Sequence, residues 1–97
     1  MISDFNEAKI ISMELLSELC QNNKFVDADS LVRQLKSKGV DPVHLHRIIG
    51  PTFKALEKIG AIRDTGRGKA SERNSGNLIK VWRSCLFNAE ITQKVNT

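Results

Sequence analysis

Apolar residues recur at intervals of three and four in three stretches of the chain, which is the spacing expected for helices with one buried face. These stretches are residues 4–22, 27–38 and 41–60. Asp27 and Asp41 can cap the last two helices, and either Asp4 or Ser3 can cap the first. The last two stretches are followed by or end at a glycine that suits a helix C-terminus. Between the first two stretches, residues 24–26 form a short extended link that can add one rung to a sheet.

The third stretch, DPVHLHRIIGPTFKALEKIG, has two chemically different sides. Asp41 can cap the helix, Pro42 suits its first position, and Gly60 suits a left-handed C-cap. At about 100° per residue, one side is apolar and consists of Leu45, Ile48, Ile49, Phe53, Leu56 and Ile59. A second arc of roughly 80° has no acidic residue and consists of His44, Arg47, Lys54 and Lys58. Such a helix can pack on a core while it contacts a polyanion, although a surface helix with solvated lysines would show the same pattern.

Gly50 and Pro51 lie in the middle of this helix. Pro51 has no amide proton to donate to the carbonyl of Arg47, so we expect a kink or a break at this point.

The pattern changes after the third helix. Residues 61–64 and 77–83 are short runs that suit strands, and the second run is rich in β-branched and aromatic residues. Residues 65–76, TGRGKASERNSG, contain three glycines, two serines and no large apolar residue. We therefore predict a β-hairpin with a long, mobile tip that carries Arg67, Lys69 and Arg73 against one Glu72. Trp82 is expected to anchor the base of the hairpin in the core.

A chain of 97 residues with 40% hydrophobic content suits one modest domain, which we place at residues 1–87, followed by a polar tail at 88–97 that should fray. No apolar run approaches the roughly 20 residues of a membrane span, and the first ten residues do not resemble a signal peptide. Cys20 and Cys85 lie far apart and are expected to be free thiols in the core. We therefore expect a cytoplasmic protein with no membrane partner.

Charge is distributed unevenly along the chain. Residues 1–30 contain two basic and six acidic residues, whereas residues 31–83 contain twelve basic and four acidic ones. A basic half set against an acidic half is typical of a nucleic-acid-binding protein. An acidic protein partner would also fit this distribution.

The predicted order of helix, short strand, helix, turn, helix and two-stranded hairpin resembles that of winged helix-turn-helix domains. The resemblance covers roughly residues 4–83 and rests also on FVDADSLVRQLKSKGV, on the LEKIGAI ending of the third helix, and on the hairpin that closes with IKVWR. The small size and the IKVWR ending are similar to short winged-helix proteins of bacteriophages and other mobile elements. The resemblance implies an α+β fold of three helices and a two-stranded wing. It also implies that the protein acts in the cytoplasm of a bacterial or phage-infected host cell.

The resemblance further implies double-stranded DNA binding, with the third helix in the major groove and the wing on the backbone or in the minor groove. The helix residues carried over are His44, Arg47, Thr52, Lys54 and Lys58. Those of the wing and its base are Arg63, Arg67, Lys69, Arg73 and Lys80. His44 and Arg47 are near the helix start and should read base edges, while Lys54 and Lys58 should contact phosphates. The protein would be a regulator or an accessory factor of replication or recombination, and a homodimer would compensate for the weak reading of one domain.

Other chemistries find less support. His44 and His46 point apart on a helix, whereas metal sites need three or four convergent ligands. The GRGK run lacks the spacing and the following helix of a phosphate-binding loop. Asp27 and Asp29 suit caps better than a catalytic pair, so we expect no enzymatic activity, cofactor or metal. The main alternative is a winged helix that docks a protein, such as a small phage factor that binds and modulates a host enzyme.

Overall fold

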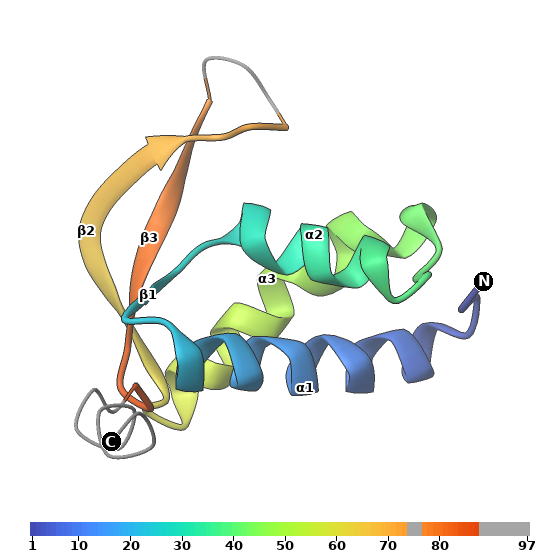
Figure 1. The fold of residues 1–97 in the computed structure, drawn as a ribbon, viewed down its shortest axis with the longest axis horizontal. Coiled ribbons are helices and arrows are strands. Elements are labelled where there is room, and N and C mark those ends of the chain that lie inside the picture. Colours follow the sequence, from blue (N-terminus) through green and yellow to red (C-terminus); the bar gives the residue numbers. More distant parts are fainter. Residues whose placement is uncertain (74–76, 88–97) are drawn as a thin grey trace, which may run out of the picture.

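The computed structural model describes residues 1–73 and 77–87 of the 97-residue chain. Within these ranges the chain forms three helices and one three-stranded antiparallel sheet, an α+β fold (Figure 1). The elements in chain order are α1 Phe5–Asn22, β1 Phe25–Val26, α2 Ala28–Ser37, α3 Pro42–Lys58, β2 Ile62–Ala70 and β3 Leu78–Ser84. The sheet stands at one end of the helices and the N-terminus lies at the other (Figure 1).

Each helix begins at the aspartate that the sequence indicates. The carboxylate of Asp4 accepts a hydrogen bond from the amide of Glu7 at 2.9 Å. Asp27 likewise accepts from the amide of Ser30, and Asp41 accepts from the amide of Val43. A side-chain acceptor at this position satisfies an amide that has no partner within the helix. The predicted starts of all three helices are therefore confirmed.

Helix α3 is continuous from Pro42 to Lys58, so Pro51 does not break it. It ends before Gly60, whose φ of 80° lies in the left-handed region that favours glycine, as predicted. The predicted apolar side is buried except for Ile59, which follows the last turn and is exposed.

The sheet has three strands rather than the two of the predicted hairpin, because β1, which lies within the predicted extended link at residues 24–26, pairs with β3 and the strand order is β1-β3-β2. The predicted loop at 65–76 is also wrong in its first half, because β2 continues to Ala70. This long strand accommodates its glycines through a register shift between Asp64 and Gly68, with Gly66 at a φ of 74°. Residues 74–76 of the predicted tip and the predicted tail at 88–97 lie outside the described residues.

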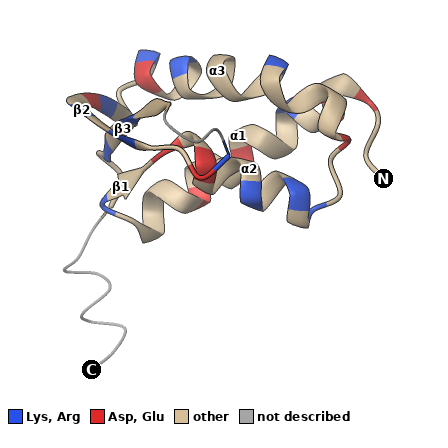
Figure 2. Cartoon of the chain, turned by 90° about the horizontal axis from the view of Figure 1, so that it is seen from above, with Lys and Arg blue, Asp and Glu red and all other residues tan. Residues whose placement is uncertain are grey.

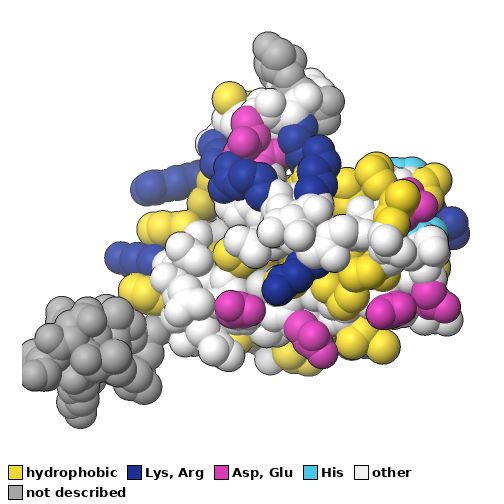
Figure 3. Space-filling model, turned by 45° about the vertical axis from the view of Figure 1, so that its right-hand side comes forward, with side chains coloured by type: hydrophobic (Ala, Val, Ile, Leu, Met, Phe, Trp, Pro, Cys, Tyr) yellow, Lys and Arg dark blue, Asp and Glu magenta, His cyan; other side chains and the backbone are white. Residues whose placement is uncertain are grey.

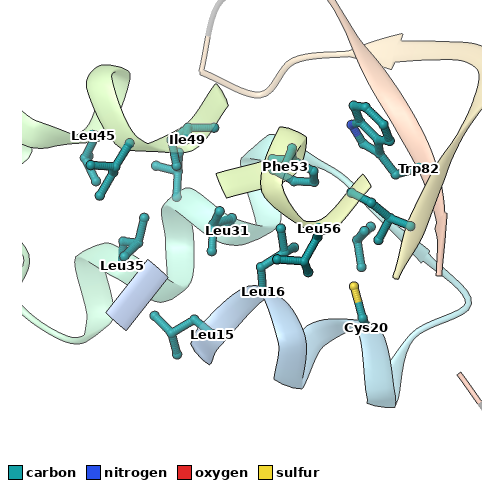
Figure 4. Close-up of a cluster of buried hydrophobic side chains, with 14 of the residues drawn as sticks. Leu15, Leu16, Cys20, Leu31, Leu35, Leu45, Ile49, Phe53, Leu56 and Trp82 are labelled. Carbon is teal, nitrogen blue, oxygen red and sulfur yellow. The ribbon is translucent and has the colours of Figure 1, made fainter. Parts of the chain in front are cut away.

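The core lies between the three helices and the inner face of the sheet (Figure 4). Its largest fully buried apolar side chains are Leu16, Leu31, Leu35, Ile48, Leu56 and Ile62. Trp82 is buried and stacks on Phe53 with ring centroids 5.7 Å apart, so its predicted role as a hairpin anchor is confirmed. Cys20 is buried as expected, and burial raises the pKa of its thiol, but Cys85 is exposed because it follows the end of β3.

Candidate nucleic-acid interface

The outward face of α3 is the strip that neither the core nor α1 covers. It runs the length of the helix, along one edge of the molecule (Figure 2). Its exposed residues are Pro42, Val43, His46, Arg47, Gly50, Pro51, Lys54, Glu57 and Lys58. Below, this set is called the α3 strip.

Three of the predicted helix contacts lie on this strip. Arg47, Lys54 and Lys58 are exposed, and within the described ranges none of them forms an ion pair with a carboxylate. The guanidinium of Arg47 lies 4.9 Å from the ring centroid of Phe5 on α1, which holds this side chain at the side of the strip. Gly50 has no side chain and Pro51 has a short one, so the middle of the strip is flatter than its two ends.

His44 does not lie on the strip with the other predicted helix contacts, because it is half-buried beside the residues that precede α1. Its Nε2 is 2.7 Å from the carbonyl oxygen of Ser3, and its ring centroid is 5.4 Å from that of Phe5. Its Nδ1 is buried and has no hydrogen-bond partner among the described residues. The residues before α1 therefore cover this side of the helix, which the spacing within α3 alone could not reveal.

Thr52 is buried, so its predicted placement on the exposed surface is wrong. Its hydroxyl donates to the carbonyl oxygen of Ile48 at 2.6 Å, and its oxygen lies 2.8 Å from the hydroxyl of Ser12 on α1. Because Thr52 has only one hydroxyl proton, Ser12 must be the donor in the second bond. Both hydroxyls are satisfied inside the α1–α3 contact.

His46, rather than the predicted His44, is the exposed histidine of the α3 strip. It is exposed at the start of the strip, four residues before Gly50 and eight before Lys54. This four-residue spacing is a usable signal, but the basic arc of His44, Arg47, Lys54 and Lys58 leaves His46 outside.

The hairpin meets α3 at a cleft of about 290 Å³. Lys54 and Glu57 line it from the helix, Lys80 lines it from β3, and its floor is apolar and includes Phe53 and Trp82. The ammonium of Lys80 is 3.3 Å from Asp64 and 5.4 Å from the Trp82 ring centroid. The hydrogen bond from the amide of Gly66, with that from Lys80, holds the pKa of Asp64 below its usual value, so this carboxylate stays charged at neutral pH.

Two of the predicted wing contacts are instead tied to α2. The ammonium of Lys69 is 3.1 Å from Asp27, and Nε of Arg73 is 2.6 Å from the buried Asp29. Arg33 of α2 forms a further ion pair with Glu72. These three pairs, here called the α2–hairpin clamp, hold residues 69–73 against the first turns of α2 and partly neutralise the positive charge of the wing.

Arg63 and Arg67 lie apart from the α3 strip. Arg63 is paired in register with Arg83 on β3, which in turn is paired with Phe25 on β1. Opposite residues in neighbouring strands project from the same face of a sheet. The predicted hairpin residues outside the clamp therefore fall on two surfaces, because Lys80 projects beside Trp82 toward α3 whereas Arg63 projects away from it.

Sequence reasoning did not identify Arg83 and Phe25 as surface residues of interest. Side chains alternate between the two faces of β3, so the burial of Trp82 places Arg83 on the outer face. That Phe25 lies beside Arg83 on this face depends on the pairing of β1 with β3, which is decided by the tertiary structure.

Comparisons of the chain with models of protein families, with curated proteins and with solved structures found no match. In the part of the chain that the structure describes, no group of three or more His, Cys, Asp or Glu side chains is arranged to hold a metal ion. Among the same residues, no helix has the length and apolar character needed to cross a membrane.

Proposed function

We propose that the chain is a non-enzymatic, double-stranded DNA-binding protein of the winged-helix type, acting as a regulator or as an accessory factor of replication or recombination. The observation that carries this proposal is the α3 strip, where Arg47, Lys54 and Lys58 are exposed and form no ion pair with a carboxylate of the described residues, beside a hairpin that adds Lys80. The element order supports it, since three helices precede the hairpin as in that superfamily.

In this proposal α3 enters the major groove, which is wide enough to admit a helix. His46 and Arg47 lie in its first half, where side chains of a recognition helix reach base edges. Arg47 is suited to guanine, because a guanidinium can donate to O6 and N7 together. The flat surface at Gly50 and Pro51 would let the helix backbone approach the groove closely.

Lys54, Lys58 and Lys80 would supply affinity rather than specificity. Lysine contacts with phosphates position a protein on DNA and release counterions, but they carry no direct sequence information. Lys80 lies across the cleft from Lys54, so the sugar-phosphate backbone of one DNA strand would pass between α3 and the hairpin. A single domain would then read few bases, and we propose that a homodimer binds the full site.

The test is fluorescence anisotropy with a labelled random-sequence duplex at low salt, using the wild type and four charge or burial variants. We expect Lys54→Glu and Lys58→Glu each to weaken binding at least tenfold, because each replaces a phosphate contact with a repulsive charge. Lys36→Glu on α2 is the matched control, since it makes the same charge change at an exposed residue outside the strip.

Thr52→Val is the second control, because its hydroxyl is buried and should not reach DNA. We expect binding by this variant to stay within about twofold of wild type once folding is checked by circular dichroism. Equal losses in Lys54→Glu and Lys36→Glu would mean that net charge alone drives binding. Absence of duplex binding by the folded wild type would overturn the proposal.

A second candidate function is protein docking, and a hollow of about 200 Å³ between α1 and α3 favours it. Its wall is mainly apolar and includes Phe5, Met13, Pro51 and Ala55, and Arg47 also lines it. A partner helix with one apolar and one acidic side would suit this hollow. If the folded protein ignores DNA, Met13→Glu combined with a pull-down would test whether this hollow holds a protein partner.

A further inference from the structure

The outer face of the sheet carries a row of one aromatic and two basic side chains, one from each strand. Phe25 of β1, Arg83 of β3 and Arg63 of β2 are consecutive partners in the register. Phe25 is 47% exposed although its side chain is large and apolar. Residues on either side of this row in sequence, Val26 and Trp82, are buried against the helices, so the row faces away from α3.

The two arginines in this row are placed against each other. Like charges that are directly opposite on one face of a sheet destabilise the pairing. Within residues 1–73 and 77–87, neither Arg63 nor Arg83 forms an ion pair with a carboxylate that could relieve this repulsion. An arrangement that is unfavourable for folding and concentrates positive charge at one place points to an anionic ligand.

A cleft of about 420 Å³ opens at this row, within the roughly 300–1,000 Å³ range of ligand sites. Arg67 also lines it, from within the register shift of β2, one residue after the left-handed Gly66. Asp64 is the acidic residue at the cleft, but the amide of Gly66 and the ammonium of Lys80 already engage its carboxylate. The positive charge of the three arginines is therefore only partly offset.

The exposed aromatic ring sits among cations. The guanidinium of Arg83 and the ammonium of Lys24 each lie 5.7 Å from the ring centroid of Phe25, at the outer limit of cation–π contact. Figure 3 shows Lys and Arg side chains that project beside hydrophobic ones along the side of the molecule where the sheet stands. An aromatic platform bordered by flexible cations is the combination that binds unpaired bases and their phosphates in single-stranded nucleic acid.

We propose that this outer face binds single-stranded nucleic acid, as a site separate from the α3 strip. An unpaired base stacks on Phe25, where it displaces the loosely held Lys24, and the flanking phosphates bind Arg63, Arg67 and Arg83. A duplex is a poor ligand here, because its bases are stacked on one another and cannot lie on the ring. An acidic peptide would satisfy the arginines but would leave the exposed ring without a planar partner.

The test is anisotropy with labelled dodecathymidylate at low salt, using the full-length chain. Phe25→Leu keeps an apolar side chain on β1 but removes the aromatic ring, and we expect it to weaken binding about 5- to 100-fold. Arg63→Gln and Arg83→Gln should each reduce the slope of log affinity against log salt by about 0.7, the value for one phosphate of a single strand. Lys54→Gln on α3 is the matched control and should change affinity for the single strand less than twofold.

An abasic oligonucleotide of the same length separates stacking from charge. We expect it to bind the wild type about as weakly as dodecathymidylate binds Phe25→Leu. Equal affinity of the wild type for the abasic and normal strands would overturn base stacking, and stronger competition by a deca-glutamate peptide would reassign the face to an acidic protein. Duplex binding through α3 is measured separately with Lys54→Glu, so either surface can fail without deciding the other.

Discussion

Asp29 is a carboxylate whose side chain has no exposed surface, one residue into the first turn of α2. Burial by itself would raise its pKa, but hydrogen bonds from Arg73 Nε, the Glu72 amide and the Ser71 hydroxyl outweigh burial and hold the pKa below its ordinary value. The arginine that the sequence assigned to a nucleic-acid ligand is thereby used inside the fold. The buried carboxylate of Asp29 therefore determines that Arg73 is engaged within the fold and is not available to a ligand.

The sign of this shift predicts a pH dependence. A carboxylate with a lowered pKa in the folded state stabilises the fold at pH values above its unfolded pKa of about 4, and that stabilisation is lost as pH falls through the folded pKa. We expect Asp29→Asn to lower the free energy of unfolding by about 2 kcal/mol at pH 7, because hydrogen bonds to a charged acceptor are lost. Urea unfolding at pH 7 and pH 3 measures this.

The difference in free energy of unfolding between Asp29→Asn and wild type should shrink at pH 3. The wild-type carboxylate is then protonated in a growing fraction of molecules and is uncharged, as asparagine is at every pH. Asp4→Asn is the control, since its carboxylate is an exposed helix cap with an ordinary amide partner. A difference that is the same at both pH values would show that the ionised form of Asp29 does not matter to the clamp.

At the scale of elements, α3 has a face for the core and a face for solvent, and its neighbours set the boundary between them. Helix α1 covers the side that holds Thr52 and, with the residues before it, His44. The strip is therefore narrower on that side and wider toward His46 than helical spacing alone implies. The hairpin is constrained in the same manner, since the clamp joins it to α2.

Pro51 gives a prediction at this scale. It lies in the interior of α3 with an exposed side chain and supplies no amide to the carbonyl of Arg47. We expect Pro51→Ala to raise the free energy of unfolding by about 1 kcal/mol, because alanine restores the hydrogen bond and favours the helix. Thermal unfolding followed by circular dichroism measures this, and Gly50→Ala is the control for helix propensity without a restored bond. A lower stability of Pro51→Ala would mean that α3 packs only in its proline-adapted shape.

In the folded molecule, paired and unpaired cations lie on different surfaces, and this distribution does not follow the acidic and basic halves of the sequence. In the described residues, acidic side chains of α2 and the hairpin pair with cations, while the α3 strip and the outer sheet face retain unpaired ones. The two faces lie on different sides of the molecule, since Trp82 packs toward α3 and Arg83 projects the other way. Two nucleic-acid ligands could thus bind without overlap.

This sorting predicts the salt dependence of duplex binding. If Arg47, Lys54 and Lys58 each contact a phosphate, the slope of log affinity against log salt should be about −3, and Lys80 should add little because Asp64 already pairs with its ammonium. Lys69→Gln should leave the slope unchanged within about 0.3, because Asp27 already pairs with that ammonium, whereas Lys58→Gln should reduce it by about 1. Equal changes in the two variants would mean that the clamp opens when DNA binds.

The sequence by itself determined the three helices, their aspartate caps, the glycine that ends α3, and the buried Trp82, because these depend on local hydrogen bonding and on apolar spacing within one element. It also indicated Arg47, Lys54 and Lys58 as exposed, since they oppose the apolar side of α3. Tertiary structure alone decided the remainder. Which side of α3 meets α1, which cations find Asp27 or Asp29, and which side chains line up across three strands all depend on contacts between residues distant in sequence, and no periodicity within one segment encodes those contacts.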